Sequence, residues 1–338
     1  MKAIGYYTNL SIDQADALVE LDLPEPEPGP HDLLVDVRAV SVNPVDTKLR
    51  RNAAPTDGQP RVLGFDAAGV VRAVGAEVSL FKPGDRVWYA GSIARGGSNA
   101  QRQLVDERIA GRMPATLDFA QAAALPLTAI TAWELLFDRL QVRRDSSGES
   151  LLVTGAAGGV GSILVQLARR LTGLRVIGTA SRAETRSWVE SLGAHDVIDH
   201  SRPLGEELRR IGADQIDFVA SLTHTDQHFD AIVEALKPQG RLGLIDDPAT
   251  PLDVMKLKRK ALSLHWELMF TRSLFQTPDM IEQHHLLGAV ADLIDNGTLV
   301  TTVGEHFGTI NATNLRRAHA LIESGTARGK IVLEGFGG

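Results

Sequence analysis

Residues 151–170 read LLVTGAAGGVGSILVQLARR, and this stretch decides the fold of the chain. Leu151-Leu152-Val153 is a short apolar run of the kind found in a strand that is buried on both faces. A turn rich in glycine and alanine follows, and beyond it apolar residues recur at three- and four-residue spacing, which predicts a helix. A strand, a tight turn and a helix in this order form the phosphate-binding unit of a doubly wound parallel sheet.

The turn itself carries A-x-G-x-x-G, a variant of the dinucleotide-binding fingerprint. Its third residue, Gly158, permits close approach of a pyrophosphate to the backbone, and Gly161 permits close helix packing. The first N–H groups of the helix and the positive end of its dipole would face the phosphates. A tight turn favours glycine for its conformation alone, so the surroundings of the motif decide its meaning. The turn residues expected to contact the cofactor are Ala156, Gly158, Gly159, Val160 and Gly161.

The residues that follow repeat the alternation of strand and helix. An apolar strand is expected at 175–179, and Ser181-Arg182-Ala183-Glu184 then has the spacing of a capping box. Further strands are expected at 195–200, 218–222, 241–245 and 261–266, with a helix at 225–236. The fold class is therefore α/β, with a Rossmann doubly wound parallel sheet.

The composition excludes several classes of function. The chain has 338 residues, a net charge of −7 and no cysteine. The acidic balance argues against nucleic acid as a partner, and the lack of cysteine removes disulfides and thiolate zinc sites. No apolar signal segment and no run of eighteen apolar residues occur, so we expect a soluble cytoplasmic protein without a membrane partner.

The N-terminal third has a different texture, with short strands broken by glycine and proline. Strands are expected at 2–6, 33–40, 69–75 and 84–89, which suggests a small all-β, barrel-like domain. Three of its segments are Ser41-Val42-Asn43-Pro44-Val45-Asp46, LGFDAAGVV at 63–71 and FKPGDRV at 81–87. In order and spacing they resemble the GroES-like domain of the medium-chain dehydrogenase/reductase superfamily, and GKIVL at 329–333 fits the same superfamily.

This resemblance covers essentially the whole chain and implies two domains. A GroES-like catalytic domain would comprise residues 1–125 and 270–338, and an NADP-binding Rossmann domain residues 126–269. Within the superfamily the chain is similar to the zinc-independent quinone oxidoreductase branch, specifically the subgroup called zinc-type alcohol dehydrogenase-like proteins.

The expected zinc ligands are missing. Zinc-binding relatives use a cysteine near the position of Asn43 and the histidine of a G-H-E motif, where this chain has Gly64-Phe65-Asp66. Phe65 has no metal-binding atom, and the segment 91–103 lacks the four-cysteine lobe of those relatives. No metal is therefore expected, and His224, His228 and His284-His285 are interpreted as solvated surface residues.

The choice of cofactor is predicted from the end of the second strand. A Rossmann unit that selects NAD normally has an acidic residue there, which binds the ribose 2′-hydroxyl. This chain has Ser181 and Arg182, and a guanidinium can bind a 2′-phosphate bidentately. NADPH is therefore the expected cofactor, with His200 beside the adenine or its phosphate.

The resemblance also places residues around the nicotinamide, in a cleft between the domains. Thr128 and Thr131 would lie beneath it, although both could simply cap or pack their helix. Asn43, Lys48 and Tyr89 would orient the substrate, although Asn43 could be only a turn former before Pro44. The segment 266–275 would form an apolar pocket wall. The remaining residues expected near the nicotinamide, at the ends of the fourth and fifth strands, are Ser221, Thr223, Ile245 and Asp246.

The expected function is NADPH-dependent, zinc-independent reduction of quinones or α,β-unsaturated carbonyls by hydride transfer. The partners would be a small-molecule substrate and a second copy of the chain, because an apolar edge strand at 261–266 favours a homodimer. Two alternatives remain open at this point. One is a zinc-dependent alcohol dehydrogenase, and the other is a non-enzymatic role, structural as in lens crystallins or RNA-binding.

Overall fold

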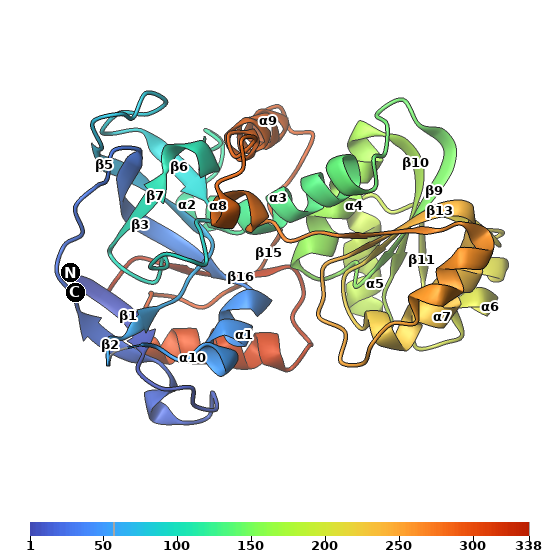
Figure 1. Cartoon of the computed structure of the whole chain (residues 1–338), viewed down its shortest axis with the longest axis horizontal. Helices are drawn as coiled ribbons and strands as arrows, with labels where there is room; N and C mark the ends of the chain where they lie inside the picture. Colours follow the sequence, from blue (N-terminus) through green and yellow to red (C-terminus); the bar gives the residue numbers. More distant parts are fainter. Residues whose placement is uncertain (57, 338) are drawn as a thin grey trace. The chain divides into compact units, whose positions relative to one another are not determined.

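The computed structural model describes residues 1–56 and 58–337, which form two compact units (Figure 1). The first unit comprises Met1–Ile130 and Phe270–Gly338, and the second comprises Thr131–Met269. The first boundary lies within helix α3 (Pro126–Trp133), whereas the sequence suggested a division just before that helix.

The second unit is built on six parallel strands in the order β11-β10-β9-β12-β13-β14. From β9 the chain proceeds through β10 to β11 at one edge, then returns to the other side of β9 at β12. The carboxyl ends of β9 and β12 are thus adjacent at the point where the strand order reverses, the usual place for a ligand in such a sheet. The strands are β9 (Ser147–Thr154), β10 (Gly173–Thr179), β11 (Asp196–Ile198), β12 (Ile216–Ser221), β13 (Leu236–Leu244) and β14 (Ser263–Trp266).

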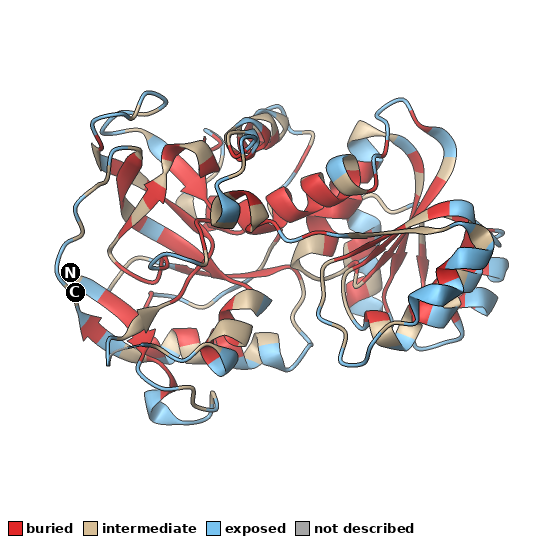
Figure 2. Cartoon of the chain, viewed as in Figure 1, coloured by how far each residue is buried: buried red, intermediate tan, exposed pale blue. Residues whose placement is uncertain are grey.

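Helices cover both faces of this sheet. Ile177 of β10 belongs to a core shared with α6, α7 and η4, whereas a Cβ at the next residue, Gly178, would lie 2.6 Å from Val189 of α5 on the opposite face. Figure 2 shows the strands buried between helices whose outer surfaces are exposed. The helices are α4 (Gly159–Leu171), α5 (Ala183–Ser191), α6 (Leu204–Arg210), α7 (Thr225–Ala235), the 3₁₀ segment η4 (Val254–Lys260) and the π-helical segment η3 (Glu134–Arg139).

Burial on both faces explains the apolar run that marks β9. Leu151, Leu152 and Val153 are all fully buried, and full burial of such a side chain contributes about 1.5–3 kcal/mol. The segment Lys237 to Gly240 belongs to β13, which shifts register against β12 there.

The first unit contains a seven-stranded sheet ordered β15-β16-β3-β5-β6-β8, with β7 paired to β3, and a three-stranded sheet ordered β2-β1-β4. The long strand β3 organises the larger sheet, because it pairs with β5, β7 and β16. The strands are β1 (Lys2–Tyr6), β2 (Val19–Asp22), β3 (Asp32–Val42), β4 (Arg61–Val62), β5 (Ala67–Val74), β6 (Arg86–Tyr89), β7 (Arg102–Asp106), β8 (Ala110–Arg112), β15 (Val303–His306) and β16 (Lys330–Glu334).

Short helices pack around these strands. In Figure 1, α1 and α10 lie side by side, and α9 packs on β8. Helix α9 begins at Glu282. The remaining bounds are η1 (Ala15–Ala17), α1 (Pro44–Asn52), η2 (Glu107–Ile109), α2 (Phe119–Ala123), α8 (Thr271–Phe275), α9 (Glu282–Asp295) and α10 (Ala312–Glu323).

The segment Phe119–Arg139 has the length and hydropathy of a membrane span. However, 83% of its most apolar window is buried inside the fold, and it consists of α2, α3 and η3 in succession. Such burial is typical of a core helix inside a folded domain.

Candidate functional site

The turn between β9 and α4 contains two glycines with different roles. A Cβ at Gly161 would lie 2.5 Å from the carbonyl oxygen of Gly155 and 2.6 Å from the Cα of Ala156, so any side chain there would displace backbone. At Gly158 the nearest such atom is 3.4 Å away, an ordinary contact. Gly161 is therefore required for helix packing, whereas Gly158 keeps the surface of the turn free of a side chain.

The first turn of α4 presents backbone donors at this turn. Gly158 is the N-cap of α4, and it has no side chain that could bond the following N–H groups. Gly159, Val160 and Gly161 lie in the first turn, where an α-helix offers no intrahelical acceptor. With the positive end of the helix dipole, these donors suit a phosphate, so the chain's own backbone fits a dinucleotide here.

Polar side chains hold the carboxyl ends of β9 and β12 together. The hydroxyl of Ser221 lies 3.4 Å from that of Thr154 and 2.7 Å from that of Thr225. Asp246 accepts hydrogen bonds from the backbone N–H of Thr225 at 2.9 Å and from its hydroxyl, so it fixes the start of α7. The hydroxyl of Thr223 pairs with the ring of the adjacent His224 at 2.8 Å. Ser221 and Asp246 thus already have structural partners, while Ile245 is half-buried beyond β13.

A positively charged residue, Arg182, follows the end of β10, and the strand itself contains no acidic residue. Arg182 is the N-cap of α5 and makes no side-chain cap, so the capping box expected from Ser181 to Glu184 was wrong. The guanidinium is 44% exposed and lies 3.8 Å from the carboxylate of Glu184. His200 is exposed after β11, which pairs with β10, so both residues lie at the carboxyl edge of the same sheet.

The two threonines predicted beneath the nicotinamide are both buried, on one helical segment. The hydroxyl of Thr128 donates to the carbonyl of Leu125 at 3.0 Å, which is the capping role considered as its alternative. Its oxygen retains lone pairs that can accept a further hydrogen bond.

Asn43 lies in the buried interior of the first unit, where it begins α1. Its backbone N–H donates to the carboxylate of Asp46 at 2.8 Å, and Pro44 occupies the first helical position, so the residue is an N-cap. Its side-chain amide donates to the carboxylate of Asp66 at 2.8 Å. Asn43 is only 1% exposed, and a contact with substrate therefore remains a prediction.

Asn43, Asp46, Asp66 and Lys330 form a buried group that we call the Lys330 cluster. The ammonium of Lys330 lies 3.0 Å from a carboxylate oxygen of Asp66 and also bonds the amide oxygen of Asn43. Burial raises the pKa of Asp46 to about 7, and it also raises the pKa of Asp66, which Lys330 opposes. This cluster was not identified from the sequence. The charged residues inside the apolar motifs at 63–71 and 329–333 were a signal for it, because charged side chains are rarely buried without a partner.

The other residues predicted to orient substrate differ in exposure. Tyr89 ends β6 and is 1% exposed, and burial raises the pKa of its phenol, which has no hydrogen-bond partner among the residues the structure describes. Lys48 is half-buried on α1.

The expected apolar wall at 266–275 is not one surface. Phe270 packs edge to face on Phe65, with ring centres 5.5 Å apart, inside the first unit. Met269 is also buried, whereas Trp266 and Phe275 are exposed. The large apolar side chains of this segment therefore divide between the interior and the surface.

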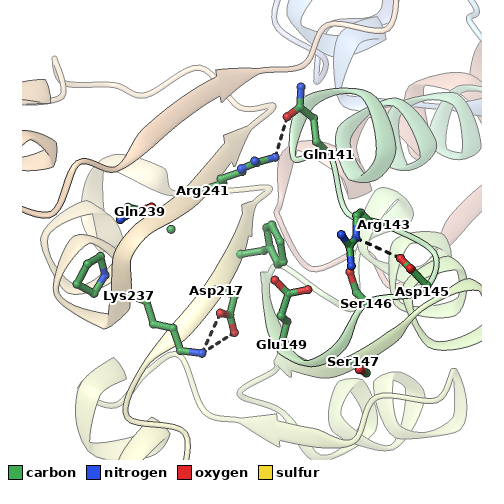
Figure 3. A pocket seen from close by; sticks show the side chains of 13 residues that line it. Gln141, Arg143, Asp145, Ser146, Ser147, Glu149, Asp217, Lys237, Gln239 and Arg241 are labelled. Carbon is green, nitrogen blue, oxygen red and sulfur yellow. Dashed lines mark hydrogen bonds and ion pairs between the residues drawn. The ribbon is translucent and has the colours of Figure 1, made fainter.

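A polar hollow of about 570 Å³ lies at the opposite end of the second unit's sheet (Figure 3). It is lined by residues that begin β9, β12 and β13, among them Glu149, Asp217 and Lys237. Lys237 and Asp217 form an ion pair at 2.8 Å across it. Because dinucleotides bind at the carboxyl ends of such strands, this hollow at the amino ends does not fit the cofactor.

Within residues 1–56 and 58–337, no three histidine, aspartate or glutamate side chains are grouped so that they could hold a metal ion. His284, expected at the surface, is instead half-buried: its ring packs edge to face with Phe81, and its Nδ1 lies 2.8 Å from the carbonyl oxygen of Ala110. His319 is fully buried.

Two protein families match the chain in agreement with this geometry. The alcohol dehydrogenase GroES-like domain family matches residues 29–125, which lie in the first unit. The zinc-binding dehydrogenase family matches residues 192–333.

A zinc-type alcohol dehydrogenase-like protein of Staphylococcus epidermidis is 38% identical over 336 residues, which are 98% of this chain and 99% of that protein. A solved structure from Rhizobium etli CFN 42, of a proposed zinc-dependent alcohol dehydrogenase, is 57% identical with a TM-score of 0.97 and covers 100% of this chain and 98% of its own. The structure of Escherichia coli quinone oxidoreductase complexed with NADPH is 25% identical, with a TM-score of 0.84 and coverage of 99% and 100%. The chain is therefore an oxidoreductase of the medium-chain dehydrogenase/reductase superfamily, and it belongs to the zinc-type alcohol dehydrogenase-like subgroup.

Proposed function

We propose that the protein is an NADPH-dependent, zinc-independent oxidoreductase that reduces quinones or α,β-unsaturated carbonyls. The observation that carries this proposal is a pairing of two features in one chain. The dinucleotide-binding turn is complete, whereas the residues in the positions of the zinc ligands are Asn43 and Phe65. A nicotinamide cofactor is supported by the relationship to a quinone oxidoreductase whose structure contains NADPH.

The preference for the phosphorylated cofactor is argued from charge. Arg182 offers a half-exposed guanidinium at the end of β10, and the residue that would be acidic in an NAD-selective site is the buried Ala180. His200 would lie beside the adenine. Gly158 to Gly161 would hold the pyrophosphate, and Thr128 and Thr131 would accept hydrogen bonds from the carboxamide of the nicotinamide.

Zinc does not fit the residues present. Phe65 has no ligand atom and packs on Phe270, and both carboxylate oxygens of Asp46 accept backbone N–H groups, from Asn43 and Gly64. The carboxylate of Asp66 already binds the ammonium of Lys330. Because the carboxylates of Asp46 and Asp66 both have other partners, a metal ion is not part of the proposed reaction.

A quinone or conjugated enone needs less from the protein than an alcohol does. The bound cofactor supplies a hydride, and the negative charge that develops on the substrate spreads into a phenolate or enolate. Hydrogen-bond donors can stabilise such an anion, and solvent can provide its proton. Lys48 and the hydroxyl of Tyr89 are the donors proposed for this task, with Asn43 as a third group that orients the substrate. The rest of the rate enhancement would come from orientation of the two reactants.

NADPH oxidation, followed at its absorbance band against a panel of quinones, enones, enals and simple alcohols, tests this function. We expect turnover with quinones or enones, none with alcohols, and the same rate after exhaustive chelation. Loss of activity on chelation, restored by added zinc, would return the protein to the alcohol dehydrogenases. Failure of the protein to bind NADPH at all would overturn the proposed cofactor.

We also propose that the protein works in the cytoplasm as a homodimer. Strand β14 is an edge of the sheet in the second unit, and Trp266 and Leu268 beside it are 52% and 50% exposed. An edge of this kind is stabilised when a second copy pairs with it. Light scattering of the purified protein should give twice the chain mass, and Trp266→Lys should yield the monomer; a wild-type monomer would contradict the assignment.

A further inference from the structure

Lys330 places an ammonium in the interior of the first unit. It is the first residue of β16, and it is only 3% exposed. Its Nζ donates to the carbonyl of Val42 at 3.1 Å, to Asp66 Oδ2 at 3.0 Å and to the amide oxygen of Asn43. An ammonium has three N–H donors, so this one is fully bonded by three oxygens that come from two other segments of the chain.

The carboxylate that faces this ammonium is itself a bridge. Asp66 Oδ2 accepts from Lys330 and from the amide of Asn43, while Oδ1 accepts the backbone N–H of Leu127 at 2.7 Å. Leu127 lies in the first turn of α3, where a carboxylate is favoured by the helix dipole. Asp66 is fully buried, so it connects β16 to the start of α3 without access to water.

We propose that Asp66, held by the ammonium of Lys330, is a positioning residue for helix α3. The inference follows from the two oxygens of Asp66, one of which accepts from Lys330 and the other from the backbone N–H of Leu127. It rests on the proposed function in one respect, because α3 carries Thr128, which is proposed to contact the nicotinamide.

The pairing of the two charges is tested without any cofactor. Lys330→Met and Asp66→Asn each leave one buried charge alone, so each should raise the unfolding equilibrium constant by about 100-fold or more. The double variant is neutral, and the amide at position 66 can still accept the N–H of Leu127 and donate to Asn43. Its unfolding constant should therefore rise by less than about 10-fold.

The second unit offers a matched control. Lys237 pairs with Asp217 at a similar distance, but the two side chains are 37% and 16% exposed (Figure 3). Lys237→Met should change the unfolding constant by less than about 3-fold, because solvent screens an exposed pair. Urea unfolding followed by circular dichroism gives all four constants. Losses that simply add in the Lys330 and Asp66 double variant, or a double variant that folds no better than the singles, would overturn the proposal.

The positioning role has its own readout, which a purely structural role would not move. In the Lys330→Met background, Asp66→Leu removes the acceptor for Leu127, whereas Asp66→Asn keeps it, and both variants are uncharged. We expect kcat with NADPH to be lower by about 10-fold in the leucine variant, because the nicotinamide is misplaced. Affinity for 2′-phospho-ADP-ribose, which lacks the nicotinamide, should agree within about 2-fold.

Equal kcat in these two variants would show that Asp66 does not position α3. A wild-type protein that oxidises NADPH with none of the quinones or enones tested would instead overturn the proposed function. The unfolding measurements would still decide whether Lys330 and Asp66 form a coupled pair of opposite charges.

Discussion

At the turn between β9 and α4, Gly158 and Gly159 carry no side chains, and the first N–H groups of a helix have no acceptor within it. In the Lys330 cluster, by contrast, side chains fill the space and the buried ammonium is bonded by three oxygens. Both regions concentrate charge or partial charge, yet only the turn leaves its donors for a ligand. The turn therefore has donors available for a phosphate, whereas the Lys330 cluster is complete within the protein.

Gly161→Val should give the largest effect, because it attacks the backbone geometry of the turn. The new Cβ would lie 2.5 Å from a carbonyl oxygen of Gly155, an atom that cannot move without the turn itself. We expect the free energy of unfolding to fall by about 3 kcal/mol or more. Thermal and urea unfolding check this, and a variant as stable as the wild type would show that α4 can pack differently.

Gly158→Val provides the matched test in the same turn. A Cβ there meets nothing closer than 3.4 Å, and the residue has extended backbone angles that valine tolerates, so stability should change by less than about 1 kcal/mol. Affinity for NADPH should fall by about 100-fold or more, because the side chain takes the space of the pyrophosphate and two charged hydrogen bonds are lost. Calorimetric titration measures it. Unchanged affinity would place the phosphates elsewhere.

Arg182→Ala sharpens the comparison further along the same sheet edge. Loss of a hydrogen-bonded charge should weaken NADPH binding by about 1.5–3 kcal/mol. NADH lacks the 2′-phosphate, so its dissociation constant should remain nearly the same, and it serves as the control. Equal losses for both cofactors would mean that the guanidinium does not contact that phosphate.

His319 tests how a buried polar group without hydrogen-bond partners affects the stability of the folded chain. Both ring nitrogens lack hydrogen-bond partners among the described residues, and burial, helped by the charge of Arg50, lowers the pKa of His319 to about 3. In the unfolded chain, His319 therefore binds a proton near pH 6.5, whereas in the folded chain it stays neutral at that pH. The contribution of this group to the free energy of unfolding is fully present above that pH. It is lost as the pH falls toward 3, by about 2 kcal/mol between pH 7 and pH 5.

Urea unfolding at pH 8, 6 and 5 measures this slope, with His319→Leu as the comparison. The leucine variant lacks the pH-dependent contribution of His319. Its free energy of unfolding should therefore fall less between pH 7 and pH 5 than that of the wild type. Parallel curves for the two proteins would show that His319 does not titrate differently on folding.

The sequence predicted well those features that depend on neighbours along the chain. The strand, turn and helix at 151–170 are found, since their spacing encodes burial of β9 on both faces and of one face of α4. The steric need for Gly161 also followed from its place in the motif. Local patterns sufficed because each of these elements is defined by contacts a few residues apart.

Features that depend on distant segments were missed. The Lys330 cluster joins residues near 43, 66 and 330, and no periodicity links a lysine to an aspartate 264 residues earlier. The N-cap of α5 was assigned one residue early, because Ser181 has the composition of a cap but the chain enters the helix at Arg182. The partners of Ser221 and Asp246 depend likewise on how β9, β12 and α7 meet.

The position of Lys330 in β16 has a consequence for synthesis of the chain. The first unit is made in two pieces, and the whole second unit is translated between Asp66 and the lysine that neutralises it. On the ribosome the second unit can fold as a continuous segment, while the first is left with a carboxylate that has no counter-ion. Residues 1–130 therefore cannot complete their buried ion pair until β16 has been synthesised and its ammonium joins Asn43 and Asp66.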